Sequence, residues 1–300
     1  MTSSAAGTTA AERAPIPGGE IHWTTTADGV RLHALHLPGP VGPARPGPRT
    51  AVVVAHGFGG GLHRAALLRV LGGLQRGAGV VAADLRGHGR SGGACTAGER
   101  EAFDVDALVG LARAVGYERV ATLGFSMGGS SVLRHAGLRG GPLLGLPLEH
   151  APDAVIAVSA TSRWFVTDTP GMRRVTWMLS SAAGRRAARL ALGVRVDPAG
   201  WRDVPASPVD VIGAIPPLPL LLVHGERDPY FTQEHPHALA AAAGPGGATL
   251  WLEPGMGHAE NAVTLPLLGR LARAVGDLAG RAAPQTATGA ESWRPWATGP

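Results

Sequence analysis

The chain has 300 residues, enough for one large domain or for one domain with an insertion. Hydrophobic residues make up 45% of it and charged residues 16%, a balance typical of globular enzymes and not of disordered chains. The formal net charge is +5, but the arginines form no single run. Their densest group, over residues 173–189, lacks the interleaved aromatic residues of an RNA-binding segment. We therefore expect no nucleic-acid partner.

The cysteine content and the apolar segments limit the class of protein further. Cys95 is the single cysteine, which excludes an intramolecular disulfide and a cysteine-based zinc site. The N-terminus lacks the basic start and apolar segment of a signal peptide. The longest apolar stretches are shorter than the roughly 20 residues that a membrane span needs. These features predict a cytoplasmic protein without a membrane span, and they do not indicate its oligomeric state.

The first elements along the chain precede the main alternating pattern. Residues 1–17 are small and polar and predict a flexible tail. Residues 20–26 and 30–37 are β-like runs on either side of an Asp-Gly pair, which is a strong hairpin signal. Residues 38–48 are rich in glycine and proline and predict a non-helical connector.

From residue 51 onward, short apolar runs alternate with helix-compatible stretches. The apolar runs lack polar alternation, as strands buried on both faces of a parallel sheet do. They cover residues 51–55, 79–84, 120–125, 154–160, 218–223 and 248–252. The helical stretches between and after them cover residues 62–75, 100–115, 126–138, 234–243 and 265–278. This order predicts an α/β fold with a doubly wound, mostly parallel sheet, preceded by an antiparallel hairpin.

One interval, residues 161–217, is much longer than the usual connection between two strands. It contains Trp164, Met172 and Trp177, and we interpret it as a small helical lid. The alternative is a decorated crossover that does not contact a ligand. The resulting layout is a core over residues 18–160 and 218–280, a lid over residues 161–217, and flexible tails over residues 1–17 and 281–300.

A five-residue motif identifies the candidate nucleophile. Residues 124–128 read G-F-S-M-G and follow the predicted strand 120–125, with the predicted helix 126–138 beginning inside the motif. Glycines two residues before and after Ser126 allow a strand to turn directly into a helix. Such a turn presents the serine hydroxyl beside a base and at a helix N-terminus, where a developing oxyanion is favoured.

An acid and a base follow in the order that a Ser–acid–His triad requires. Asp228 comes just after the strand 218–223, and His258 comes just after the strand 248–252. Both therefore belong to the carboxyl edge of the sheet, where open α/β sheets bind ligands. Glu226 is the rival for the acid, being nearer to the strand.

With these motifs in order, the chain resembles the α/β-hydrolase superfamily, in its lid-bearing serine esterase or peptidase-like branch, over about residues 20–278. The resemblance implies the α/β-hydrolase fold, with helices flanking the sheet and a small helical lid. It also implies that the H-G-F-G-G segment at 56–60 is the oxyanion loop, whose donors would be the N–H groups of Phe58 and Met127. In that family the segment D-L-R-G-H-G-R-S at 84–91 is structural, and the acid is the residue before Pro229, namely Asp228.

The identity of residue 126 narrows the chemistry. Dehalogenases and epoxide hydrolases of this fold use an aspartate there, so Ser126 indicates acyl transfer through an acyl-enzyme. We expect a hydrolase of carboxylic esters with small or medium acyl groups, and a pocket that includes Phe58, Trp164, Met172 and Trp177. The expected partner is a small-molecule ester or amide, with no metal or organic cofactor.

Several alternatives remain open at this point. The same triad serves aminopeptidases, amidases, thioesterases, perhydrolases and C–C hydrolases, and some relatives of this fold are non-catalytic binding modules. An aminopeptidase would need carboxylates in the lid to bind an amino terminus. The lid offers four, against many arginines: Asp168, Asp197, Asp203 and Asp210.

The remaining histidines and the cysteine have no motif that suggests a reaction. We interpret His56 as a structural hydrogen-bonding residue, and Cys95 as inert. The histidines interpreted as surface or packed residues, and not as ligands, are His22, His33, His36, His135, His150, His235 and His237.

Overall fold

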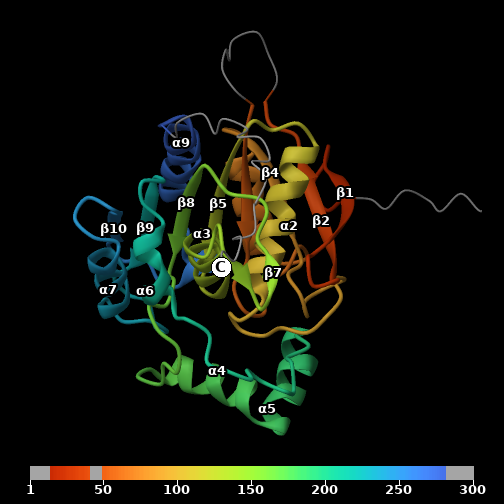
Figure 1. Cartoon of the computed structure of the whole chain (residues 1–300), viewed down its shortest axis with the longest axis vertical. Helices are drawn as coiled ribbons and strands as arrows, with labels where there is room; N and C mark the ends of the chain where they lie inside the picture. The colour runs from red at the N-terminus through yellow and green to blue at the C-terminus, as the bar shows by residue number, and fades with distance from the viewer. Residues whose placement is uncertain (1–13, 41–48, 282–300) are drawn as a thin grey trace, which may run out of the picture.

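A mixed eight-stranded sheet forms the centre of the molecule, in a computed structural model that describes residues 14–40 and 49–281. The strand order is β1-β2-β4-β3-β5-β8-β9-β10, with β1 and β10 at the two edges (Figure 1). The hairpin strands are β1 (Glu20–Thr25) and β2 (Arg31–Leu37), paired antiparallel. The six strands after them are mutually parallel: β3 (Thr50–Ala55), β4 (Gly79–Ala83), β5 (Arg119–Phe125), β8 (Ala154–Val158), β9 (Leu220–Gly225) and β10 (Thr249–Glu253). The predicted α/β class and the mostly parallel sheet are confirmed.

The central strands are apolar at every position because both of their faces are covered. In β3, Val52 and Val54 point into one hydrophobic cluster, whereas Ala51, Val53 and Ala55 point into the other. No face of this strand meets water, so the polar alternation of a half-exposed strand is absent from its sequence.

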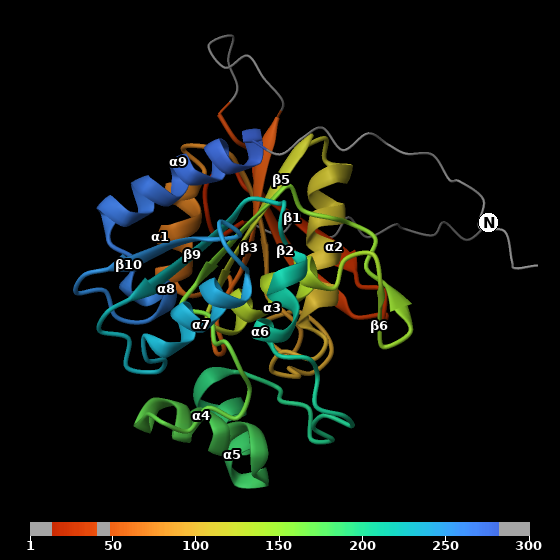
Figure 2. The same cartoon turned by 60° about the vertical axis from the view of Figure 1, so that its left-hand side comes forward.

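Two layers of helices cover the sheet (Figure 2). One layer consists of α1 (Ala65–Leu74), α8 (Ala259–Ala262) and α9 (Leu265–Arg281), which share the cluster that contains Val52. The other consists of α2 (Glu101–Ala114), α3 (Met127–Gly137) and α7 (Glu234–Ala242).

The segment over residues 84–91 ties the hairpin to the core. Arg86 donates hydrogen bonds of 2.7 and 2.9 Å to Asp28 in the hairpin turn, and one of 2.8 Å to the buried Asp104 of α2. Burial acts to raise the pKa of Asp28, but the hydrogen bonds from Arg86 and Thr26 lower it below its usual value. The arginine of this motif therefore has the structural role that the family resemblance implies.

The insertion, residues 161–217, lies between β8 and β9. It contains α4 (Pro170–Ser180), α5 (Ala182–Ala187), the π-helix η1 (Ala188–Leu192), α6 (Pro208–Val211) and the 3₁₀-helix η2 (Ile212–Ala214). Helices α4 and α5 lie beyond one end of the strands, whereas α6 and η2 pack on α3 and α7 (Figure 2). The helical part that stands away from the sheet is therefore shorter than the predicted lid.

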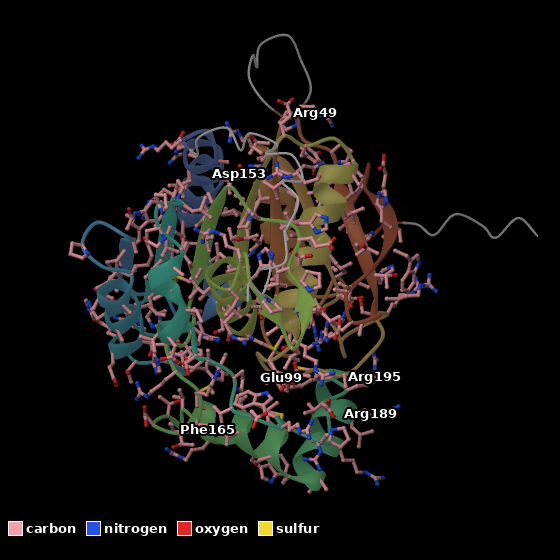
Figure 3. All side chains as sticks on the ribbon, in the orientation of Figure 1. Arg49, Glu99, Asp153, Phe165, Arg189 and Arg195 are labelled. Carbon is pink, nitrogen blue, oxygen red and sulfur yellow. The ribbon has the colours of Figure 1, made fainter. Side chains whose placement is uncertain are left out.

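The chain returning from α5 is anchored to the core beside the segment 84–91. A parallel bridge joins Cys95 and Val196, and the N–H of Arg195 donates to the oxygen of Gly87 at 2.8 Å. The Arg195 guanidinium also hydrogen-bonds Ser91. Figure 3 shows Arg195 at this junction, and Arg189 and Phe165 elsewhere on the insertion.

Some predicted boundaries shift. Of the predicted tail 1–17, residues 14–17 are described, and Ala14 and Ile16 pack against the core; residues 1–13 lie outside the described residues. Arg281 is the last residue of α9, and the predicted second tail otherwise lies outside the described residues, as does most of the connector. Within the described residues, no helix combines the length and apolar character needed to cross a bilayer.

Candidate active site

Ser126 occupies a sharp turn between β5 and α3. Its backbone has φ 51° and ψ −115°, a left-handed conformation that non-glycine residues rarely adopt. A Cβ atom at Gly124 would overlap the backbone of Gly128, and one at Gly128 would overlap the backbone of Ala55. The two glycines are therefore required by close backbone contact, and the predicted strand–turn–helix context of the motif is present.

Asp228 and His258 form a short hydrogen bond, with 2.7 Å between Asp228 Oδ2 and His258 Nδ1. The carboxylate can only accept, so Nδ1 carries the proton and Nε2 is left as the basic nitrogen of the neutral ring. Asp228 Oδ1 accepts from the N–H groups of Tyr230 at 2.8 Å and Phe231 at 3.1 Å. The acid is thus fixed by two backbone donors and aimed at the imidazole.

The environment of Asp228 keeps it ionised. Its side chain is fully buried, and burial, the largest single influence, acts to raise its pKa. The hydrogen bond and charge of His258 and the two backbone donors outweigh this effect and hold the pKa below its usual value. Glu226, in contrast, is exposed, so the geometry favours Asp228 as the acid.

Ser126 and His258 both lie on the wall of one cavity. No hydrogen bond joins their side chains among the described residues. The rings of Tyr230 and Phe231 pack against the imidazole, with centroid distances of 4.5 and 5.5 Å, and His258 remains 15% exposed. The imidazole is held between these rings and its acid, and it faces the cavity that contains the serine.

Backbone donors suitable for an oxyanion lie at the start of α3 and after β3. The N–H groups of Gly57, Gly59 and Gly60 each donate a hydrogen bond within the protein. Across the described part of the chain, the N–H groups of Phe58 and Met127 make no such bond, and both residues line the cavity. These two N–H groups are the donors that the family resemblance implies.

Two buried histidines support the loop that carries Phe58. Burial, with the nearby histidine His56, lowers the pKa of His88 to about 3, so this ring is neutral and its Nε2 accepts from the Gly59 N–H at 3.2 Å. Burial likewise lowers the pKa of His56, whose Nε2 accepts from the Leu85 N–H at 3.0 Å. His56 is therefore a structural residue, as the sequence predicts.

The cavity has a volume of about 800 Å³, and the core and the insertion both contribute to its wall. Phe58, Trp164 and Met172 line it, but Trp177 does not and is 46% exposed. This corrects the predicted pocket. Trp177 lies four residues after Arg173 on α4, which places both on the helix face turned away from the cavity.

The family assignment follows from a match over most of the chain. The Alpha/beta hydrolase family matches residues 52–273. The chain belongs to this family.

Solved structures similar to this hydrolase include the Pyrococcus furiosus esterase Pf2001, at 19% identity and a TM-score of 0.63, covering 87% of this chain and 93% of that one. The alpha/beta hydrolase GrgF from Penicillium sp. matches at 17% identity and a TM-score of 0.63, over 88% and 100% of the two chains. Est1E from Butyrivibrio proteoclasticus, solved with ferulic acid, matches at 21% identity and a TM-score of 0.52, covering 85% of this chain and 96% of that one. At these identities the similarity shows the fold alone. A search of curated proteins gives no match.

The hydrolase places one further acidic residue beside the nucleophile, which the sequence reasoning missed. Glu260, 6% exposed, accepts from the Gly57 N–H at 3.3 Å. A Cβ atom at Gly57 would lie 3.3 Å from Ser126 Cβ and 3.4 Å from Glu260 Oε2. Its position two residues after His258, at the start of α8, was the available signal, but the contact with Gly57 spans 203 residues.

Proposed function

We propose that this member of the family is a serine hydrolase that cleaves carboxylic esters of small or medium acyl size through an acyl-enzyme. One observation is the main support for the proposal. The buried Asp228 is hydrogen-bonded to His258 at 2.7 Å, and this imidazole faces the same cavity as the strained Ser126. A base oriented by an acid, beside a serine at a sharp turn, is the arrangement that activates a hydroxyl nucleophile.

The steps follow from this geometry. Ser126 Oγ attacks the ester carbonyl as His258 Nε2 takes its proton, and Asp228 stabilises the imidazolium that forms. The N–H groups of Phe58 and Met127 bind the oxyanion of the tetrahedral intermediate. Protonated His258 gives its proton to the leaving alcohol, which leaves Ser126 acylated. A water molecule, deprotonated by His258, then releases the acid and restores the serine.

The expected acyl size depends on the cavity. A volume of about 800 Å³ lies within the usual range for small-molecule sites. Its wall carries apolar side chains such as Phe58, Trp164 and Met172, which suit an acyl or aryl group better than a charged one. The similar structure from Pyrococcus furiosus is described as an esterase, which supports the same reaction.

Active-site labelling and ester turnover test the proposal together. The wild type and Ser126→Ala are incubated with a fluorophosphonate probe, and the labelled residue is located by peptide mass spectrometry. Both proteins are then assayed with p-nitrophenyl esters of increasing acyl length. We expect label on Ser126 alone and turnover that the variant lacks. Wild-type turnover no higher than that of the variant, with no label on Ser126, would contradict the proposal.

A second candidate, an aminopeptidase or amidase, is favoured by one specific feature. Glu260 and Asp197 both place carboxylates on the cavity wall, where they could bind an ammonium group. Asp168, which pairs with Arg163, and Asp210, which caps α6, do not line the cavity. Amino-acid naphthylamides compared with esters and thioesters of the same acyl group distinguish the candidates. A higher kcat/KM for the naphthylamides would replace the ester proposal.

A further inference from the structure

Three metal-ligand side chains converge on the N-terminal hairpin, away from the cavity. Glu20 and His22 lie on the same face of β1, because side chains two residues apart in a strand point the same way. His36 of β2 is the direct cross-strand partner of Glu20. The hairpin register therefore brings two imidazoles to one carboxylate.

The distances between the donor atoms of these three side chains are close to those in a metal site. His36 Nδ1 lies 3.1 Å from Glu20 Oε2, and His22 Nε2 lies 3.5 Å from the same oxygen. All three donor atoms lie within 4.8 Å of one another. In a tetrahedral zinc site with ligand bonds of about 2.0–2.1 Å, donor atoms are about 3.3–3.5 Å apart. The strand pairing already brings the three backbone positions together. Rotation of the side chains is therefore enough to bring the donor atoms to these separations.

His36 is oriented as a metal ligand would be. Its side chain is 7% exposed, and its other ring nitrogen, Nε2, lies 3.0 Å from the hydroxyl of the buried Tyr117. A proton on Nε2, donated to this hydroxyl, leaves the Nδ1 lone pair directed toward Glu20. Metal-bound histidines usually have such a partner on the second nitrogen, which fixes the tautomer and the ring orientation.

His22 supplies a further observation. Its Nε2 atom is shielded from solvent, and among the described residues it makes no hydrogen bond of good geometry, although Glu20 Oε2 lies 3.5 Å away. Leaving a buried polar nitrogen unpaired is costly, and the His36–Glu20 contact does not relieve it. A cation placed between the three side chains would use this lone pair.

We propose that Glu20, His22 and His36 form a binding site for a divalent transition cation, with Zn²⁺ as the fitting ion and water in its fourth position. Two imidazoles and one carboxylate favour such an ion over Mg²⁺ or Ca²⁺, which prefer oxygen ligands. None of the three residues lines the cavity, so the ion has no part in hydrolysis. It joins the edge strand β1 to β2 and stabilises their pairing.

The interpretation of these histidines thus differs from the one that the sequence alone supports. In the sequence, Glu20 and His22 form only a two-residue pattern, and His36 lies 16 positions from Glu20. The third ligand becomes recognisable only when the register of the hairpin is known.

Calorimetry on full-length protein, with any polyhistidine tag removed and metals stripped by a chelator, tests the site. ZnCl₂ is titrated into wild type, His22→Ala, Glu20→Gln and the control His237→Ala, which removes an exposed histidine of α7. We expect one Zn²⁺ per chain with a micromolar Kd in the wild type and in the control. We expect a Kd at least about tenfold weaker in the other two variants, since each lacks one ligand.

Thermal unfolding provides the second readout. Saturating Zn²⁺ should raise the Tm of the wild type and of His237→Ala, because a ligand that binds only the folded state stabilises it, whereas MgCl₂ at the same concentration should not. Ester turnover by His22→Ala should equal that of the wild type. Absence of wild-type binding, or a Zn²⁺ affinity of His22→Ala and Glu20→Gln equal to that of the wild type, would overturn the proposal. Loss of binding in His237→Ala would overturn it as well, because it would place the ion elsewhere.

Discussion

The two walls of the cavity are built in different ways. The wall formed by the sheet carries Ser126, Asp228 and His258 on short turns after parallel strands, and the acid is fully buried and held by two backbone N–H groups. The opposite wall is formed by the insertion and includes α4, in which no residue is buried. A bond of 2.9 Å from the Thr169 hydroxyl to the oxygen of Tyr230 is one of the contacts that attach this helix to the core.

This difference separates the residues that react from those that affect substrate affinity. Folding of the core fixes the groups that react, because moving them would break buried hydrogen bonds. Helix α4 adds apolar surface but has no buried residue, so it can change without disturbing the core. We therefore expect substitutions on the sheet wall to affect turnover and stability, and substitutions on the insertion to affect substrate affinity.

The largest effect should come from the acid. Asp228→Asn keeps the size of the side chain but favours the wrong imidazole tautomer, and we expect a loss in kcat of about 10³–10⁴-fold. Glu226→Gln, two residues away and exposed, is the matched control and should leave kcat unchanged. Steady-state assays with a p-nitrophenyl ester measure both. A large loss in the Glu226 variant with a small one in the Asp228 variant would move the acid to Glu226.

The next effect concerns stability of the loop beneath the site. Burial acts to raise the pKa of Asp84, but hydrogen bonds with His33 and with the N–H groups of Arg90 and Leu62 lower it to about 2. This carboxylate therefore stabilises the fold above pH 4, and the contribution is lost as the pH falls toward 2. Asp84→Asn should lower the free energy of unfolding at pH 7 by about 2 kcal/mol.

Urea unfolding at pH 7, 5 and 3 measures this contribution. The difference between wild type and Asp84→Asn should shrink at pH 3, where part of the wild-type carboxyl is protonated in the unfolded chain. The control is Asp277→Asn, at an exposed position on α9, which should have no effect at any of these pH values. A difference that stays constant with pH would show that the charge of Asp84 is not what stabilises the loop.

A smaller effect should follow from Glu260, which holds Gly57 at the start of the oxyanion loop. Glu260→Ala removes the acceptor, and we expect about a tenfold loss in kcat with little change in KM, because the loop donors act mainly in the transition state. Glu260→Gln keeps an acceptor oxygen and should recover most of the activity. If Gln is as impaired as Ala while both retain the wild-type Tm, the charge matters and the positioning role is wrong.

The sequence predicts the sheet wall well because its signals are local. Strands buried on both faces, such as β3 and β8, are apolar at nearly every residue, and the turn at Ser126 requires glycines at fixed offsets. The order of Ser126, Asp228 and His258 then follows from which strands end at one edge. Their catalytic roles remain a prediction until the activity is measured.

What the sequence does not predict depends on contacts distant in the chain. The two-residue strands β6 (Pro142–Leu143) and β7 (Leu146–Pro147) are too short to show a period. Glu260 is recognisable as part of the site only through its contact with Gly57. On α4, large apolar residues occur on more than one face, so the sequence cannot tell which of them meets the cavity.

The smallest effect is expected from substitutions in α4. These substitutions are also the most specific test of the difference between the two walls of the cavity. Met172 lines the cavity, and Trp177 on the same helix is turned outward. Met172→Ala removes part of an apolar wall from substrate and transition state alike, so it should raise KM for medium-chain esters by about fivefold at unchanged kcat. Trp177→Ala, the control, should change neither, although it deletes the larger side chain. If Trp177→Ala raises KM as much as Met172→Ala, the helix closes over the substrate in another orientation, and the insertion wall is rearranged when a ligand binds.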